Sequence, residues 1–210
     1  CVVDAVNAAV REENEHIHME PGKGDAVMEC WVPEFVEHSD FKTWKEYDEF
    51  LYAIFRRCFI ESKPVFKGKP VNVRSNPRFE EREESYWHIT CCDYAHKSGL
   101  PESRDPDLER CRRIKWPRAF IENYLSCDPV NDLCDCGGVK IWKSSHKPKK
   151  GRPKVRVKLF LEEESYLVVL EERGQYYLLI TAYYLDDEIS LKRTLREMEK
   201  KGAINAGSAC

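Results

Sequence analysis

One histidine and two hydroxyl side chains of this sequence have the chemistry needed for acid–base work on a phosphate ester. His88 lies in the segment Ser85–Thr90 between two apolar neighbours. An ordinary imidazole titrates at about pH 6.5, so His88 can give or take a proton near neutrality. Thr181 follows an apolar run and Tyr183 comes two residues later, so both hydroxyls share one face of an expected strand. His88, Thr181 and Tyr183 are therefore candidate catalytic residues.

Three arginines supply the positive charge that such a site needs. Arg110, Arg113 and Arg118 flank Trp116, and a guanidinium can bind a phosphate through two parallel hydrogen bonds. Cleavage of RNA without a metal needs a base for the 2′-hydroxyl, a proton donor for the leaving 5′ oxygen and cations around the phosphate. We add Arg113 to the catalytic candidates and take Arg110, Arg118 and Trp116 as candidate nucleic-acid contacts.

Each of these assignments has a structural alternative. A lone histidine on a strand is often a satisfied structural residue, and the arginines can form surface ion pairs with acids of the same polar segment. Thr181 and Tyr183 can pack in or against a sheet. Trp116 and Trp142 can stack on an unpaired base or lie in the core. The residue types alone leave both interpretations open.

A basic run begins at Gly138 and ends at Leu161. It contains nine lysines and arginines and no acidic residue. Between Val155 and Leu161 apolar residues alternate with Arg156 and Lys158, which indicates a strand with its basic side chains on one face. We expect the run to contact a nucleic-acid backbone, through Lys140, Arg156 and Lys158, with binding that weakens as salt rises. A solvated loop is the alternative for its Lys- and Pro-rich middle.

The chain has ten cysteines but is much longer than the small secreted domains that depend on disulfides. We therefore expect a reduced, cytoplasmic protein. Cys91, Cys127, Cys134 and Cys136 are weak candidates for a zinc site, because neither the adjacent cysteine pair nor Cys-x-Cys has the usual ligand spacing. We expect no metal and no cofactor.

Hydrophobic periodicity places these residues on a set of helices and strands. Thr43-x-x-Glu46 is a capping box, and the apolar spacing behind it predicts a helix of about 18 residues. Short strands are expected at Pro70–Arg74 and Ser85–Thr90, followed by a long ordered loop over residues 93–115. Pro117 suits the first turn of a short helix that ends at Leu125.

The second half of the chain predicts an antiparallel meander. Strands at Tyr166–Leu170 and Tyr176–Tyr184 flank a Gly-containing turn, and they follow the basic strand. A closing helix, Ile189–Lys200, is expected to pack through Ile189 and three further apolar residues, namely Leu191, Leu195 and Met198. Helices and an antiparallel sheet in this order indicate an α+β fold.

The formal charge of −3 is unevenly distributed along the 210 residues. Residues 1–40 contain ten acids and two bases, hence −8, which leaves +5 for the remainder. We divide the chain into an acidic arm (1–40), one domain (41–200) and a short tail (201–210), and the arm is a candidate cover for the basic face. The longest apolar stretch, Tyr176–Leu185, is too short to cross a bilayer, which argues against a membrane protein.

Four motifs in order resemble a phage- and prophage-associated family. They are Ser85–Thr90 (SYWHIT), Glu109–Asn123 (ERCRRIKWPRAFIEN), Tyr166–Arg173 (YLVVLEER) and Tyr177–Tyr183 (YLLITAY). That family is grouped with the barnase, EndoU, colicin and RelE-like (BECR) ribonuclease superfamily. The similarity runs from about Phe41 to Lys200.

The resemblance implies a BECR-like fold, with an N-terminal helix, an antiparallel meander and a C-terminal helix. It implies a metal-independent endoribonuclease that leaves 2′,3′-cyclic phosphate ends and acts as a prophage-linked toxin. RNA would be its substrate, and an immunity or antitoxin protein its partner. The alternative is a non-catalytic nucleic-acid-binding or phage interaction protein that uses the Lys140–Lys158 face.

Overall fold

The computed structural model describes residues 30–92, 104–127, 136–148 and 151–207. After a short 3-10 turn, η1 (His38–Asp40), the first long helix is α2 (Trp44–Phe55), which continues into the π-helical turn η2 (Arg56–Glu61). Thr43 caps α2, because its hydroxyl accepts the amide of Glu46 at 3.2 Å. The Thr43 cap and the predicted length of this helix are confirmed, but the Glu46 carboxylate accepts the amide of Lys42 at 3.1 Å and not that of Thr43.

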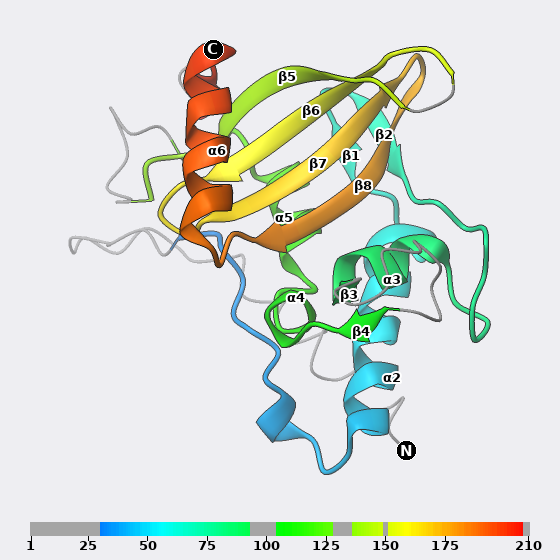
Figure 1. The fold of residues 1–210 in the computed structure, drawn as a ribbon. Coiled ribbons are helices and arrows are strands. Elements are labelled where there is room, and N and C mark those ends of the chain that lie inside the picture. The colour runs from blue at the N-terminus through cyan, green and yellow to red at the C-terminus, as the bar shows by residue number, and fades with distance from the viewer. Residues whose placement is uncertain (1–29, 93–103, 128–135, 149–150, 208–210) are drawn as a thin grey trace, which may run out of the picture.

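The centre of the molecule is a seven-stranded mixed sheet with the strand order β1-β2-β8-β7-β6-β5-β9 (Figure 1). Every pairing is antiparallel except β2 with β8, which is parallel. The α+β class and the β5–β8 meander are as predicted. The strands are β1 (Val65–Phe66), β2 (Lys69–Asn72), β5 (Lys140–His146), β6 (Lys154–Leu161), β7 (Tyr166–Arg173), β8 (Tyr176–Tyr184) and β9 (Ile204–Asn205).

The predicted strand at Ser85–Thr90 is wrong, because this segment is the helix α3 (Glu84–Thr90). Its Tyr, Trp, Ile and Thr residues favour strands by propensity, but tertiary packing decides here: every residue of α3 except His88 is buried. A helix buried on almost all sides has no apolar stripe, so the periodicity could not reveal it.

The predicted loop over residues 93–115 is also wrong in its described part. β3 (Cys91–Cys92) pairs with β4 (Asp105–Pro106), and the helix α4 (Leu108–Cys111) follows. Asp107 caps α4 by accepting the amide of Arg110 at 3.2 Å. α5 (Trp116–Glu122) confirms the short helix with a proline in its first turn, although it ends before Leu125.

The two faces of the sheet are covered differently. α5 lies behind the sheet in Figure 1, where α2, α3 and α5 share one large apolar core with inward residues of β6, β7 and β8. α6 (Glu188–Lys200) crosses the front, where a smaller apolar cluster holds it at one end of the strands. Leu191, Leu195 and Met198 pack there as predicted. Ile189 does not, since it is 81% exposed.

The ends of the described chain also join the domain. Val36 is buried in the core and its carbonyl accepts the Tyr47 hydroxyl at 2.8 Å, so the last part of the 1–40 segment packs against α2. Residues 1–29 lie outside the described part. In the 201–210 segment, Ile204–Asn205 forms β9 at the edge of β5. No helix in the described part of the chain is long and apolar enough to cross a membrane.

Candidate functional site

His88 is the one residue of α3 whose side chain is open to solvent, with 33% of it exposed. Its Nε2 lies 3.1 Å from Oε1 of Glu84 and 3.4 Å from Nη2 of Arg104. Burial lowers the pKa of His88, and the positive charges of Arg104 and Arg74 lower it further, against an opposing effect of Glu84. The ring is therefore neutral at pH 7.

The contacts of Nε2 give His88 a partner in either protonation state. When Nε2 carries a proton, it donates to the Glu84 carboxylate. When Nε2 is bare, it accepts from the guanidinium of Arg104, which is always a donor. A histidine with both kinds of neighbour can release or take up a proton without losing its orientation, as a general acid or base must.

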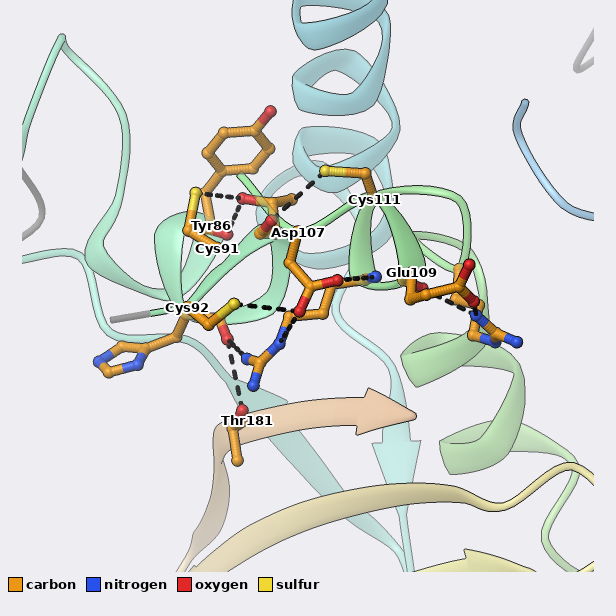
Figure 2. A network of polar contacts seen from close by, with 11 residues as sticks. Tyr86, Cys91, Cys92, Asp107, Glu109, Cys111 and Thr181 are labelled. Atoms are coloured by element: carbon orange, nitrogen blue, oxygen red, sulfur yellow. Dashed lines mark hydrogen bonds and ion pairs between the residues drawn. The ribbon is translucent and has the colours of Figure 1, made fainter. Parts of the chain in front are cut away.

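The main-chain carbonyl of His88 is held by two other predicted site residues. It accepts Nη1 of Arg110 at 2.9 Å and the hydroxyl of Thr181 at 3.3 Å. Thr181 reaches α3 from β8 just after a β-bulge at Ile180, where the register with β7 shifts. Figure 2 shows Thr181 rising from its strand toward this network. Arg110 and Thr181 thus position His88 through its main-chain carbonyl.

Asp107 fixes Arg110 in turn. Its Oδ2 lies 3.3 Å from Nε of Arg110 and accepts the Cys92 thiol at 3.1 Å, as Figure 2 shows for Cys92 and Asp107. Tyr183 lies beside the same arginine, whose guanidinium is 5.2 Å from the ring centre. Burial raises the pKa of Tyr183, so its hydroxyl stays protonated at neutral pH.

A cavity of about 200 Å³ opens beside Arg110 and Tyr183. One arginine lines it together with several carboxylates, so its walls are unfavourable for a phosphate. Its acidic lining residues are Asp107, Glu109, Asp186 and Asp187. This cavity is therefore unsuited to an anionic ligand such as a phosphate.

Arg113 lies inside the molecule and away from His88's open side. It is 5% exposed, pairs with Glu109, and its guanidinium lies 4.4 Å from the ring centre of Tyr184 and 5.1 Å from that of Trp116. Trp116 itself is buried, stacked on Phe35 at 5.2 Å. The structure thus places both residues in packing positions, which agrees with their structural alternatives.

Arg118 joins α5 to the end of the first helix. Its Nη1 donates to the carbonyls of Cys58 and Ser62, at 2.9 and 2.8 Å, and its Nη2 and Nε bind the carboxylate of Glu122. α5 lies behind the sheet, on the side away from α6 (Figure 1). Its guanidinium is thus held by carbonyls at the end of the first helix and by Glu122 of α5, none of which contacts His88.

The residues of the basic run differ in how fully their charged groups are bound by hydrogen bonds or ion pairs. Lys140 donates to the carbonyl of Gly137 at 3.2 Å, and Lys158 binds Glu197 of α6 at 2.7 Å. Arg156 lies directly opposite Glu171 across the β6–β7 pair. Burial lowers the pKa of Arg156, and its Nε is buried with no hydrogen-bond partner among the described residues.

A polar cluster on the α6-bearing face of the sheet is the feature that the sequence analysis missed. We call it the sheet-face cluster, and it consists of Lys154, Arg156, Glu171 and Arg173. Glu171 is 1% exposed, pairs with Arg173, and lies 3.6 Å from Nζ of Lys154. The sequence contained a signal for this cluster. The alternation of β7, together with its pairing with β6, puts Glu171 on the same face as Arg156.

Arg74 connects the sheet-face cluster with His88. Its Nη1 donates to Oε1 of Glu84 at 3.0 Å, and its charge lowers the pKa of both His88 and Arg156. Arg74 thus contacts the ion pair of His88 and also lies close enough to Arg156 for its charge to act there.

The structure separates the predicted cysteine candidates. Cys91 is buried near Thr90, and burial raises its pKa to about 11, which makes it a poor ligand. Cys134 lies outside the described residues. Cys127 and Cys136 do come together, and Cys30 joins them, so that the three ligand atoms lie within 4.8 Å of one another. The long separation in sequence hid Cys30.

Comparison of the chain with protein-family models, with curated proteins and with solved structures finds no match. The function therefore has to be argued from the geometry of the site.

Proposed function

We propose that this chain is an endoribonuclease that cleaves RNA without a metal ion and leaves 2′,3′-cyclic phosphate ends. The observation that carries the proposal is His88, a half-buried and neutral imidazole with a hydrogen-bond partner for each protonation state. Arg104 lies 3.4 Å from its Nε2, and the charges of Arg104 and Arg74 lower its pKa. The charge of Arg74 also acts on Arg156 of the sheet-face cluster. Acid–base chemistry next to several cations is what phosphodiester cleavage requires.

His88 is the base in this proposal. The neutral ring takes the proton of a ribose 2′-hydroxyl, and the 2′ oxygen attacks the adjacent phosphorus. The bond from phosphorus to the 5′ oxygen breaks, and that oxygen takes a proton from water. Arg104 and Arg74 stabilise the negative charge that develops on the phosphate oxygens. Arg110 and Thr181 are positioning residues, because they hold the His88 carbonyl.

The sheet-face cluster is the proposed RNA-binding surface. The side chains of Lys154 and Arg173 are 37% and 39% exposed, so their charges can be reached by a phosphate from solvent. Glu171 keeps the three cations together on the face and balances part of their charge. Binding through these residues is expected to be salt-sensitive and largely independent of base sequence.

The order of helix, meander and closing helix supports the BECR-like assignment, and we extend the proposal to that family. The biological role that follows is a prophage-linked toxin that acts on RNA inside the cell. An immunity or antitoxin protein is then the natural partner. The acidic 1–40 segment, most of which lies outside the described residues, is a candidate for shielding the cationic surface.

A nuclease assay tests the proposal. The full chain is incubated with RNA and with single-stranded DNA, each with and without EDTA, and the product ends are identified by mass spectrometry. We expect RNA alone to be cut, with cyclic phosphate ends and undiminished by EDTA. His88→Ala should lower the rate about 100- to 10,000-fold, the range typical of general acid–base catalysis. His38→Ala, an exposed histidine outside the site, is the matched control.

Intact RNA after prolonged incubation, or equal cleavage by His88→Ala, would overturn the proposal. The second candidate is a non-catalytic nucleic-acid-binding protein. The sheet-face cluster favours it, because its cations can bind a phosphate backbone without any contribution from His88. RNA gel shifts that disappear at high salt, survive His88→Ala and yield no product would support that alternative.

A further inference from the structure

Three cysteines from distant parts of the chain meet at one place. Cys30 precedes the segment that packs on α2, Cys127 follows α5, and Cys136 precedes β5. Their sulfur atoms lie within 4.8 Å of one another. Cys30 is exposed, Cys127 is buried, and Cys136 lies between these extremes. A ligand at this point would be reached from solvent on the side of Cys30.

A tryptophan beside the cluster directs a hydrogen bond at one sulfur. Nε1 of Trp31 donates to Sγ of Cys127 at 3.0 Å, and the Trp31 ring packs edge-on against Phe120 of α5 at 5.0 Å. A thiol is a weak acceptor, whereas a thiolate is a strong one. Fixed donors to ligand atoms are the usual outer shell of metal–thiolate sites.

A glycine allows the Cys127 and Cys136 segments to lie together. Gly138 has a φ of +69°, and a Cβ added there would lie 2.6 Å from the carbonyl oxygen of Cys127 and 2.8 Å from the side chain of Asn205. Only glycine fits both the conformation and the space. The backbone is therefore built for a close approach that brings the two sulfurs near each other.

We infer that Cys30, Cys127 and Cys136 bind one Zn²⁺ ion. Soft thiolate ligands select zinc over hard cations such as Mg²⁺. Zinc–sulfur bonds of about 2.3 Å in a tetrahedron place the sulfurs about 3.8 Å apart. Side-chain rotations that move each sulfur by less than about 1 Å would therefore bring the three cysteines to this spacing. A disulfide would use only two of the three sulfurs. The described residues supply three of the four ligands of a tetrahedral site, and Cys134 lies outside the described residues.

The inferred ion has a structural role. It ties the residue 30 segment to the end of α5 and to the start of β5, and Cys136 packs against the main core. Among the described residues, neither His88 nor Glu171 belongs to this group of ligand atoms. Zinc binding is thus independent of the proposed cleavage chemistry, and either proposal can fail while the other holds.

Metal analysis of the full chain tests the inference. The protein is purified under reducing conditions from cells grown with added zinc, and its metal content is measured by plasma mass spectrometry. We expect about one zinc per chain. Cobalt(II) added to the metal-free protein should give a sulfur-to-metal charge-transfer absorption, which reports thiolate ligation directly. A chelator should lower the melting temperature of the zinc-loaded protein.

The variants make the assignment specific. Cys30→Ser, Cys127→Ser and Cys136→Ser should each lose most of the zinc and of the cobalt absorption, whereas Cys58→Ser should keep both. Because Cys30 is exposed, Cys30→Ser is expected to fold even if Cys127→Ser does not. Less than about a tenth of a zinc per chain without a cobalt–sulfur absorption would overturn the inference. So would wild-type zinc content in Cys30→Ser, or a disulfide between two of these cysteines in the reduced preparation.

Discussion

The two faces of the central sheet are built from the same strands yet do different things. On one face the inward residues of β6, such as Val157 and Leu159, lie in a continuous apolar core under α2, α3 and α5. On the other face α6 covers only the end with Trp142 and Phe160, and the rest carries the sheet-face cluster. The difference shows where a ligand can bind, since no helix of the described chain is seen over the polar half of the second face (Figure 1).

The largest expected effect comes from the apolar face. Leu159 is fully buried, and Leu159→Ala should lower the free energy of unfolding by about 3 kcal/mol through lost burial and the cavity left behind. Val155 points to the same side of β6 but is 43% exposed, so Val155→Ala should cost less than about 0.5 kcal/mol. Urea denaturation measures both. Equal losses would show that this face is not the single core we describe.

Glu171 gives the next largest effect, on the polar face. Glu171→Gln removes a buried carboxylate that pairs with two partly exposed cations, and we expect a loss of about 2 kcal/mol in stability. RNA should bind more tightly, because the cations lose their counter-charge. Glu172→Gln on the opposite side of β7, where Lys143 is an exposed partner, should change stability and RNA affinity little. Weaker RNA binding by Glu171→Gln would contradict the assigned role.

A substitution at Arg156 tests whether the arginine on the polar face binds RNA while the arginines elsewhere in the molecule do not. Arg156→Ala should weaken RNA binding about tenfold at low salt and reduce the slope of log affinity against log salt by about 0.7, the value for one phosphate contact on a single strand. Arg118→Ala is the matched control, because Arg118 binds carbonyls and Glu122 behind the sheet. Fluorescence anisotropy with a labelled RNA measures both slopes, and a larger change for Arg118→Ala would reverse the comparison.

The smallest effect is a pH dependence of stability. Burial holds the pKa of His88 below its ordinary value, so at falling pH the unfolded chain takes up this proton before the folded protein does. Stability from His88 is therefore fully present above about pH 6.5 and declines as pH falls toward the lower folded pKa. Melting temperatures at pH 7.5 and 5.5 should differ more for the wild type than for His88→Asn. The same melting-temperature difference in the wild type and in His88→Asn would contradict a lowered pKa of His88.

The elements with a regular apolar period were predictable from sequence, whereas α3 and the short α4 were not, although Asp107 caps α4. β6 shows its period of two, and Thr43 begins α2 as its capping box predicts. α3 was assigned as a strand because it is buried on nearly all sides, so neither a stripe nor propensity identified it.

The candidate site divides in the same way. His88, Arg110 and Thr181 do meet, but through the carbonyl of His88, a main-chain group that no side-chain pattern reports. Arg113 carries the charge that a phosphate site needs, yet three aromatic rings enclose its guanidinium. Residue type suggested a chemistry, but only tertiary packing decided which charges face outward.

The short pairing of β2 with β8 has a consequence for self-association. β2 meets β8 only at Val71 and Asn72, so the remainder of that strand edge would offer unpaired main-chain groups to a second molecule. α3 lies along this remainder, and the bond from Thr181 to the His88 carbonyl fastens it there. The helix that presents the candidate base therefore also guards the sheet against edge-to-edge aggregation, and loosening it would endanger solubility as well as activity.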